Sequence, residues 1–221
     1  MMNFTDDLNN NRIDGAIFDM DGTLIDSMPR WKYVARDFLV SCNKTPKADL
    51  AEKVHPLSVK AAAKYFQTDY DVKLSVEEIV DGIHRQMEDY YLHEFELKPK
   101  TVEFLELLRQ HNIKMCIATA TDRRLATAAL ERNGILHFFD EIFTCAELNT
   151  SKREPKIFEV ALEFLKTEKK RTYVFEDSYF AIAAAKSVHF PVFAVYEKTA
   201  EEYSEQIKEL ADIYTSFDKI V

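Results

Sequence analysis

Two carboxylates with one residue between them mark the segment 19–23, whose sequence is Asp-Met-Asp-Gly-Thr. The segment follows an apolar run, residues 13–18, that has the length and bulk of a buried strand. Alternation along an extended backbone puts Asp19 and Asp21 on the same side, and Gly22 allows the chain to turn sharply. Two like charges a few ångströms apart repel by roughly 4 kcal/mol, so we expect this pair to need a cation, a shared proton or both. The alternative is an ordinary Asp-Gly turn without chemistry.

Polar residues also follow three later apolar segments. Thr119 comes directly after the buried run 114–118, where a hydroxyl and free backbone N–H groups before a helix suit a phosphate. Lys152 lies in a polar loop before another helical pattern, and Glu176 and Asp177 follow a short apolar run. Taken one at a time, Thr119 or Thr121 also fits an ordinary helix cap, as does Asp177 or Ser178, and the lysine fits a solvated side chain.

The elements that must position these residues change character along the chain. Residues from about 28 to 96 have apolar residues at helical spacing, and Ser75 with Glu78 fits a capping box. From about residue 98 onward, strands alternate with helices, which indicates a parallel sheet covered on both faces. The expected strands after the first are residues 114–118, 141–144, 173–175, 192–195 and 213–214, and the expected helices are residues 101–110, 123–133, 157–166, 181–187 and 203–210.

We therefore predict an α/β fold, a Rossmann-like parallel sheet core with an inserted all-helical cap domain. The core would comprise residues 1–27 and 97–221, and the cap residues 28–96. Ligands bind at the carboxyl ends of the strands in such sheets, so all four polar groups should meet at one edge. Because the acidic groups offer hard oxygen ligands, they suit Mg²⁺ rather than a transition metal.

Composition limits the classes of partner. The chain has 221 residues, 47% of them hydrophobic and 30% charged, with a formal net charge of −9 and no basic tract. These values are typical of a globular protein and argue against nucleic acid or an anionic membrane as a partner. Three separated cysteines, Cys42, Cys116 and Cys145, show no zinc or disulfide spacing and indicate reduced thiols. No leader or membrane-spanning run is visible, so we expect a cytoplasmic monomer.

The chain resembles the haloacid dehalogenase-like phosphohydrolases from about Ile13 to Val195. The first motif of that family matches residues 19–27, Thr119 matches the hydroxyl of the second, Lys152 the lysine of the third, and residues 176–178 the acidic fourth. The helical block resembles the cap of the subfamily that contains phosphoglycolate phosphatase and β-phosphoglucomutase. True dehalogenases of the family lack the second aspartate, so Asp21 indicates phosphoryl chemistry.

This resemblance implies a role for each acidic residue. Asp19 would attack phosphorus and form an aspartyl-phosphate, and Asp21 would first protonate the leaving oxygen and then take a proton from water. Mg²⁺ would be held by Asp19, by the backbone carbonyl of Asp21 and by Asp177. Glu176 would be either a further direct ligand or a neighbour of the ligands.

The resemblance also implies how phosphate is held: by Lys152, by Thr119 and by the backbone N–H groups around Ala120. Phosphoryl transfer depends mostly on positioning and charge neutralisation, which these groups provide. We therefore expect a Mg²⁺-dependent phosphatase that hydrolyses a small phosphorylated metabolite. The alternatives are a sugar-phosphate mutase on the same scaffold and a non-catalytic phosphate-binding regulatory protein. Carboxylates that repel one another argue against the last of these.

The helical block is expected to select the substrate and to move about hinges near Ser27 and Leu97. Residues 53–60 lie where relatives have their specificity loop. Lys53, His55 and Lys60 could reach a substrate anion there, although a solvated face is the simpler interpretation. A mutase needs a firm cationic grip on a distal phosphate, most effectively an arginine. This loop has none, which favours water as the acceptor.

Overall fold

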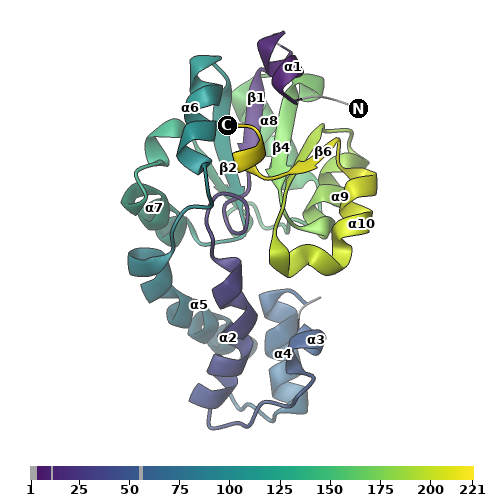
Figure 1. Ribbon diagram of the computed structural model, residues 1–221. Coiled ribbons are helices and arrows are strands. Elements are labelled where there is room, and N and C mark those ends of the chain that lie inside the picture. Colours follow the sequence, from purple (N-terminus) through teal and green to yellow (C-terminus); the bar gives the residue numbers. More distant parts are fainter. Residues whose placement is uncertain (1–3, 11, 55–56) are drawn as a thin grey trace. The chain divides into compact units, whose positions relative to one another are not determined.

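The structure is a computed structural model that describes residues 4–10, 12–54 and 57–221. The chain divides into two compact units. Met1–Asp26 and Phe95–Val221 form the first, which we call the α/β unit, and Ser27–Glu94 form the second, which we call the helical unit. Figure 1 shows the elements of each, with the helical unit in blue tones. Among the described residues, no helix is long and apolar enough to cross a membrane.

A six-stranded sheet in the order β3-β2-β1-β4-β5-β6 forms the centre of the α/β unit, and all neighbouring strands are parallel. The predicted Rossmann-like α/β core is thus confirmed. In the register, Phe18 of β1 lies opposite Ile117 of β2 and Phe175 of β4, so these three central strands end at nearly the same level. The strands are β1 Gly15–Phe18, β2 Lys114–Thr119, β3 Ile142–Thr144, β4 Thr172–Glu176, β5 Val192–Val195 and β6 Ile213–Thr215.

Apolar side chains point to both faces of this sheet, which explains why the strands are continuous hydrophobic runs. On one face, Phe18 stacks on Phe175 with ring centroids 4.3 Å apart, and aromatic residues of α1 and α6 complete the layer. On the other face, Ile17 and Val174 pack with buried residues of α8, α9 and α10. The helices of the unit are α1 Phe4–Asn9, α6 Thr101–Gln110, α7 Arg123–Arg132, α8 Lys156–Leu165, α9 Tyr179–Ser187 and α10 Ser204–Leu210. Short 3₁₀ turns are η2 Leu136–Phe138, η3 Lys169–Arg171, η4 Lys198–Tyr203 and η5 Phe217–Lys219.

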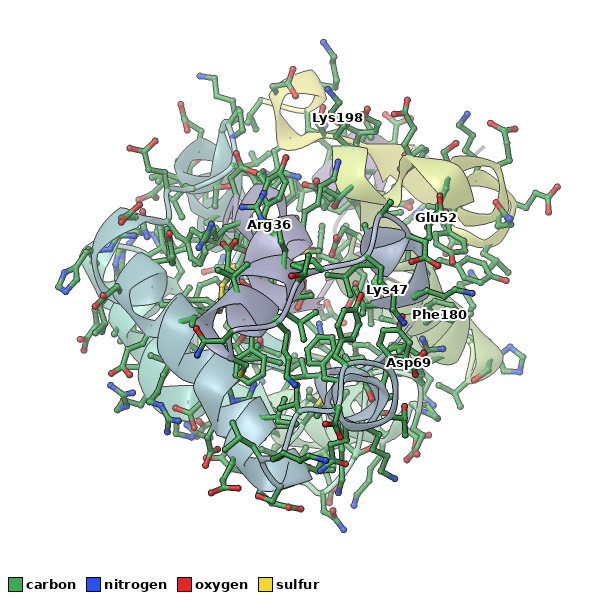
Figure 2. The ribbon with its side chains drawn as sticks, turned by 90° about the horizontal axis from the view of Figure 1, so that it is seen from below. Arg36, Lys47, Glu52, Asp69, Phe180 and Lys198 are labelled. Carbon is green, nitrogen blue, oxygen red and sulfur yellow. The ribbon has the colours of Figure 1, made fainter. Side chains whose placement is uncertain are left out.

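The helical unit contains α2 Met28–Ser41, α3 Leu50–Val54, α4 Val59–Asp69, α5 Val76–Asp89 and the π-helical turn η1 Tyr90–Glu94. Its core includes Phe38 and Phe66, whose rings stack 5.9 Å apart. The expected capping box opens α5: the Glu78 N–H donates to Ser75 Oγ (3.1 Å), and the Ser75 N–H donates to Glu78 Oε2 (2.7 Å). Beyond this core, the Lys47 ammonium lies 4.0 Å from the Asp69 carboxylate and ties the loop before α3 to the end of α4 (Figure 2).

The two segments of the α/β unit that lead to and from the helical unit pair with each other. Ile25 and Leu97 form an antiparallel bridge, flanked by hydrogen bonds from the Lys98 N–H to the Leu24 carbonyl (2.9 Å) and from the Asp26 N–H to the Glu96 carbonyl (2.9 Å). This bridge fixes both connections at one place on the α/β unit.

The Lys98 side chain ties this bridge to the end of β5. Its ammonium contacts Glu197 Oε2 at 2.6 Å and donates to the Tyr196 carbonyl at 2.9 Å. The Lys98 and Glu197 side chains are only 12% and 5% exposed, so this is a nearly buried ion pair.

Sequence patterns predicted most helices and strands to within two residues, but they missed α1. The N-terminal segment reads as polar and acidic, yet Phe4 and Leu8 are both buried, one helical turn apart. Phe4 packs edge-on against Phe175 and Phe193, with centroids 5.9 Å and 5.2 Å away. Two apolar residues are too few for a periodic pattern, so the packing against the sheet decides this helix.

Candidate active site

Asp19 is the first residue after β1, and its backbone continues the sheet. Its N–H donates to the Phe175 carbonyl at 2.9 Å, which keeps the residue in line with the end of β4. The side chain is buried, and the Lys152 ammonium contacts its Oδ1. The same ammonium reaches Glu176 Oε1 at 2.6 Å, so Lys152 bridges the carboxylates that follow β1 and end β4.

Asp19, Glu176 and Asp177 form a buried acidic cluster in which one carboxylate oxygen of each lies within 4.8 Å of the others. Burial raises the pKa of Glu176 to about 7, with Lys152 opposing that rise and Asp19 adding to it. Burial also raises the pKa of Asp177, and the neighbouring Glu176 and Asp19 add to the effect. Burial alone would lower the pKa of Lys152, but Asp19 and Glu176 outweigh it and raise it.

The charges of this cluster do not balance. Among the described residues, three buried carboxylates form this cluster and the Lys152 ammonium group contacts two of them; every donor atom that the carboxylates offer is an oxygen. Like charges so close together in a buried place call for further positive charge. A hard divalent cation that prefers oxygen ligands, such as Mg²⁺, fits this set of donors.

Asp21 lies on the turn that follows Asp19. Gly22 adopts a left-handed φ of 86°, and its N–H donates to the Ile25 carbonyl at 2.9 Å, which closes the turn. Thr23 Oγ1 donates to Asp177 Oδ1 at 3.3 Å and ties the turn to the acidic cluster. The Asp21 carboxylate accepts a hydrogen bond of 2.6 Å from the Thr121 hydroxyl. The two aspartates of the motif therefore contact different partners.

The loop after β2 begins at Thr119, which is buried, and leads into α7. The Thr121 N–H donates to Thr119 Oγ1 at 3.0 Å. The N-cap of α7 is Asp122, which accepts from the Arg124 N–H at 2.9 Å. The alternative that either threonine caps this helix is therefore wrong. The loop with Ala120 stays at the same sheet edge as Asp19, because β1 and β2 are aligned neighbours.

The other two simple interpretations are also wrong. Lys152 is not a solvated loop lysine, because its side chain is only 14% exposed and lies between two carboxylates. Asp177 does not cap α9, whose N-cap is Ser178 and has no side-chain cap. Instead, Glu176 Oε2 accepts from the N–H groups of Asp177 and Ser178, both at 2.9 Å, and these bonds fix the turn between β4 and α9.

Sequence reasoning missed several contacts around this edge. It assigned no partner to the Thr121 hydroxyl, and it overlooked Arg123. The Arg123 guanidinium contacts Glu147 at 2.6 Å and Glu141 at 2.9 Å, and so joins the start of α7 to both ends of β3. An arginine beside a helix cap gives no signal of such partners in the sequence.

The three basic residues expected to reach a substrate belong to residues 53–60, outside the α/β unit. Lys53 lies in α3 and Lys60 in α4 of the helical unit, whereas His55 lies outside the described residues. Their role toward a substrate stays a prediction.

Comparison with known proteins relates this geometry to a family. The family model described as "Haloacid dehalogenase-like hydrolase" matches residues 16–195. The phosphorylated carbohydrates phosphatase of Thermotoga maritima is 27% identical over 175 residues, which cover 79% of this chain and 81% of that protein. The fructose-1-phosphate phosphatase of Escherichia coli is 23% identical over 190 residues, which cover 80% and 93%.

A solved structure from Thermotoga maritima that is ascribed to a β-phosphoglucomutase has the same fold. It superimposes with a TM-score of 0.74 at 24% identity and covers 94% of this chain and 96% of that one. The region that the family model matches includes Asp19, Thr119, Lys152, Glu176 and Asp177. Because the family pattern spans most of the sequence, from residue 16 to residue 195, the chain belongs to the haloacid dehalogenase-like hydrolases.

Proposed function

We propose that this protein is a Mg²⁺-dependent phosphatase that hydrolyses a small phosphorylated metabolite through an aspartyl-phosphate. The observation that carries the proposal is the contact of Asp19, at the end of β1, with Lys152 inside the cluster completed by Glu176 and Asp177. The cluster thus brings together a nucleophile, oxygen ligands for a cation and an ammonium group held in place by carboxylates. The two curated relatives above are named for phosphorylated carbohydrates and fructose 1-phosphate, which supports a sugar phosphate as the substrate class.

The first half of the reaction forms the aspartyl-phosphate. An Asp19 carboxylate oxygen attacks phosphorus, and the bond from phosphorus to the leaving oxygen breaks while Asp21 gives that oxygen a proton. Lys152 and the Thr119 hydroxyl, with the N–H groups around Ala120, hold the transferred oxygens. Lys152 also orients the Asp19 carboxylate, which it contacts.

The second half releases phosphate. Asp21, now unprotonated, takes a proton from water, and the water oxygen attacks phosphorus and frees the Asp19 carboxylate. Asp19, Asp177 and the Asp21 carbonyl, beside Glu176, would hold Mg²⁺, which when bound would supply positive charge to stabilise the charge on the phosphoryl group. The buried excess of carboxylates supports this assignment, because it calls for such a cation.

Two alternatives have less support. A sugar-phosphate mutase would need a strong grip on a second phosphate, and residues 53–60 contain no arginine for it. A non-catalytic phosphate-binding protein would have no use for a carboxylate cluster that repels itself, whereas an enzyme that binds a cation there has one.

The test is phosphate release from a panel of phosphorylated sugars and other small metabolites, with and without Mg²⁺. Asp19→Asn should lower turnover on the best substrate by on the order of 10⁴-fold or more, as the loss of a nucleophile commonly does. Asp14→Asn is the matched control, because Asp14 lies just before the other end of β1 and pairs with Arg171. It should keep near-normal activity. Near-normal activity of Asp19→Asn would contradict the mechanism.

A further inference from the structure

Thr121 makes hydrogen bonds to two groups that the proposed reaction uses. Its backbone N–H donates to Thr119 Oγ1 at 3.0 Å, and its hydroxyl donates to Asp21 Oδ2 at 2.6 Å. All three residues belong to the α/β unit. The loop after β2 is thereby joined to the turn after β1 at the edge where Asp19 lies.

Each of these bonds constrains a group that the reaction uses. A hydroxyl has one proton to donate and two acceptor positions, so the N–H bond to Thr119 Oγ1 occupies an acceptor position and not the proton that a phosphate oxygen would accept. The bond to Asp21 Oδ2 holds one oxygen of that carboxyl group in place and so limits rotation of the group.

The fold does not need the Thr121 hydroxyl for its local structure. The N-cap of α7 is Asp122, so the helix begins without a cap from Thr121. The turn that carries Asp21 is closed by backbone bonds from Gly22 to Ile25 and from Ile25 to Met20, both 2.9 Å long. The hydroxyl therefore sets the orientation of a carboxylate rather than the course of the backbone.

We propose that Thr121 is a positioning residue that holds the Asp21 carboxyl group by Oδ2 and so sets the orientation in which Asp21 exchanges a proton with the leaving oxygen. The inference rests on the proposed function, because it assigns Asp21 the role of acid and base. Through its N–H and its hydroxyl, Thr121 links the phosphate-holding hydroxyl of Thr119 to the proton carrier, Asp21. Their mutual geometry is then set before the substrate arrives.

Leaving groups of different basicity test this role. The phenolate of p-nitrophenyl phosphate departs with little need of a proton, whereas the alkoxide of a sugar phosphate such as glucose 6-phosphate needs one. Thr121→Val should lower kcat/KM for the best sugar phosphate by about tenfold or more, a part of the 10²–10⁴-fold that a positioned acid contributes. For p-nitrophenyl phosphate the same variant should lose less than about threefold.

Two further variants complete the test. Thr121→Ser keeps the hydroxyl and should restore the sugar phosphate rate to within about threefold of wild type. Thr127→Val makes the same substitution within α7, away from the site, and should change neither rate. Thermal unfolding shows that each variant is folded; Thr121→Ala provides the same comparison with Thr121→Ser if valine disturbs the loop.

The outcomes separate this inference from the proposed function. An equal loss of Thr121→Val on both substrates, or no loss on either, would overturn the positioning role. If Asp19→Asn is inactive on both substrates in that case, the phosphatase mechanism still stands. If the wild-type protein releases phosphate from neither substrate nor from the panel, the proposed function fails and this inference with it.

Discussion

The nearly buried ion pair between Lys98 and Glu197 predicts a large loss of stability when only one partner is removed. Lys98→Met keeps the length and most of the volume of the side chain but removes its charge. Glu197 Oε1 would retain the N–H and hydroxyl of Thr199, both at 3.0 Å, while Oε2 would lose its cation. The variant thus leaves a carboxylate that is 5% exposed without a charge to balance it.

The magnitude follows from the burial of the pair. Removal of one partner of a buried pair costs about 3–5 kcal/mol, because the remaining charge stays buried without its partner. We therefore expect Lys98→Met to lower the free energy of unfolding by about 3–5 kcal/mol at pH 7.

Urea unfolding followed by far-ultraviolet circular dichroism at pH 7 measures this loss. Trp31, the only tryptophan, lies in the helical unit and donates to the Tyr91 hydroxyl at 3.1 Å, so its fluorescence reports the other unit separately. The double variant Lys98→Met/Glu197→Gln carries no charge and should return to within about 1 kcal/mol of wild type. A loss of less than about 1 kcal/mol, or simple additivity in the double variant, would refute the reasoning.

Three other predictions test the site and the helical unit. Chelation should stop phosphate release and Mg²⁺ should restore it; Asp177→Ala should abolish the rise in Tm caused by Mg²⁺, yet raise Tm in chelator because it removes a buried like charge. A Mg²⁺ shift that Asp177→Ala leaves unchanged would contradict this. Gly82→Ala would place a Cβ 2.5 Å from a ring carbon of Phe38, so Trp31 fluorescence should show a loss of about 1–3 kcal/mol, in contrast to the exposed control Asp81→Ala. β-Glucose 1-phosphate with a trace of the bisphosphate should yield free phosphate; rapid conversion to glucose 6-phosphate would instead assign a mutase.

The predictable parts of the fold are those that depend on local patterns of apolar and polar residues in the sequence. The alternation of apolar runs with helical spacing from about residue 98 onward determines a parallel sheet, and its register then brings the ends of β1, β2 and β4 to one edge. Asp19, Thr119 and Glu176 follow from this argument alone, because each lies at or just after the end of a buried strand. Periodicity cannot show α1, whose two apolar residues are meaningful only beside the aromatic face of the sheet.

The contacts of charged and hydroxyl side chains were not predictable from spacing. Lys152 lies 133 residues from Asp19 in the sequence, and Lys98 lies 99 from Glu197. Nothing local distinguishes either lysine from a solvated one; the resemblance to a family singled out Lys152, whereas Lys98 has no such counterpart. The Arg124 N–H at the start of α7 donates to Asp122 rather than to a threonine. The Thr121 hydroxyl therefore does not cap the helix and instead holds the Asp21 carboxylate. Such choices depend on angles within a turn, which residue types alone do not encode.

The Ile25–Leu97 bridge makes the helical unit an exchangeable insert. The chain leaves and re-enters the α/β unit at two facing residues, so the gap between Asp26 and Glu96 is only as wide as a hairpin. A two-residue turn could span it, and helical inserts of other lengths could be grafted there without a change in strand register. The insert can therefore change without altering the proposed chemistry, because the residues that we assign to that chemistry all lie outside the graft.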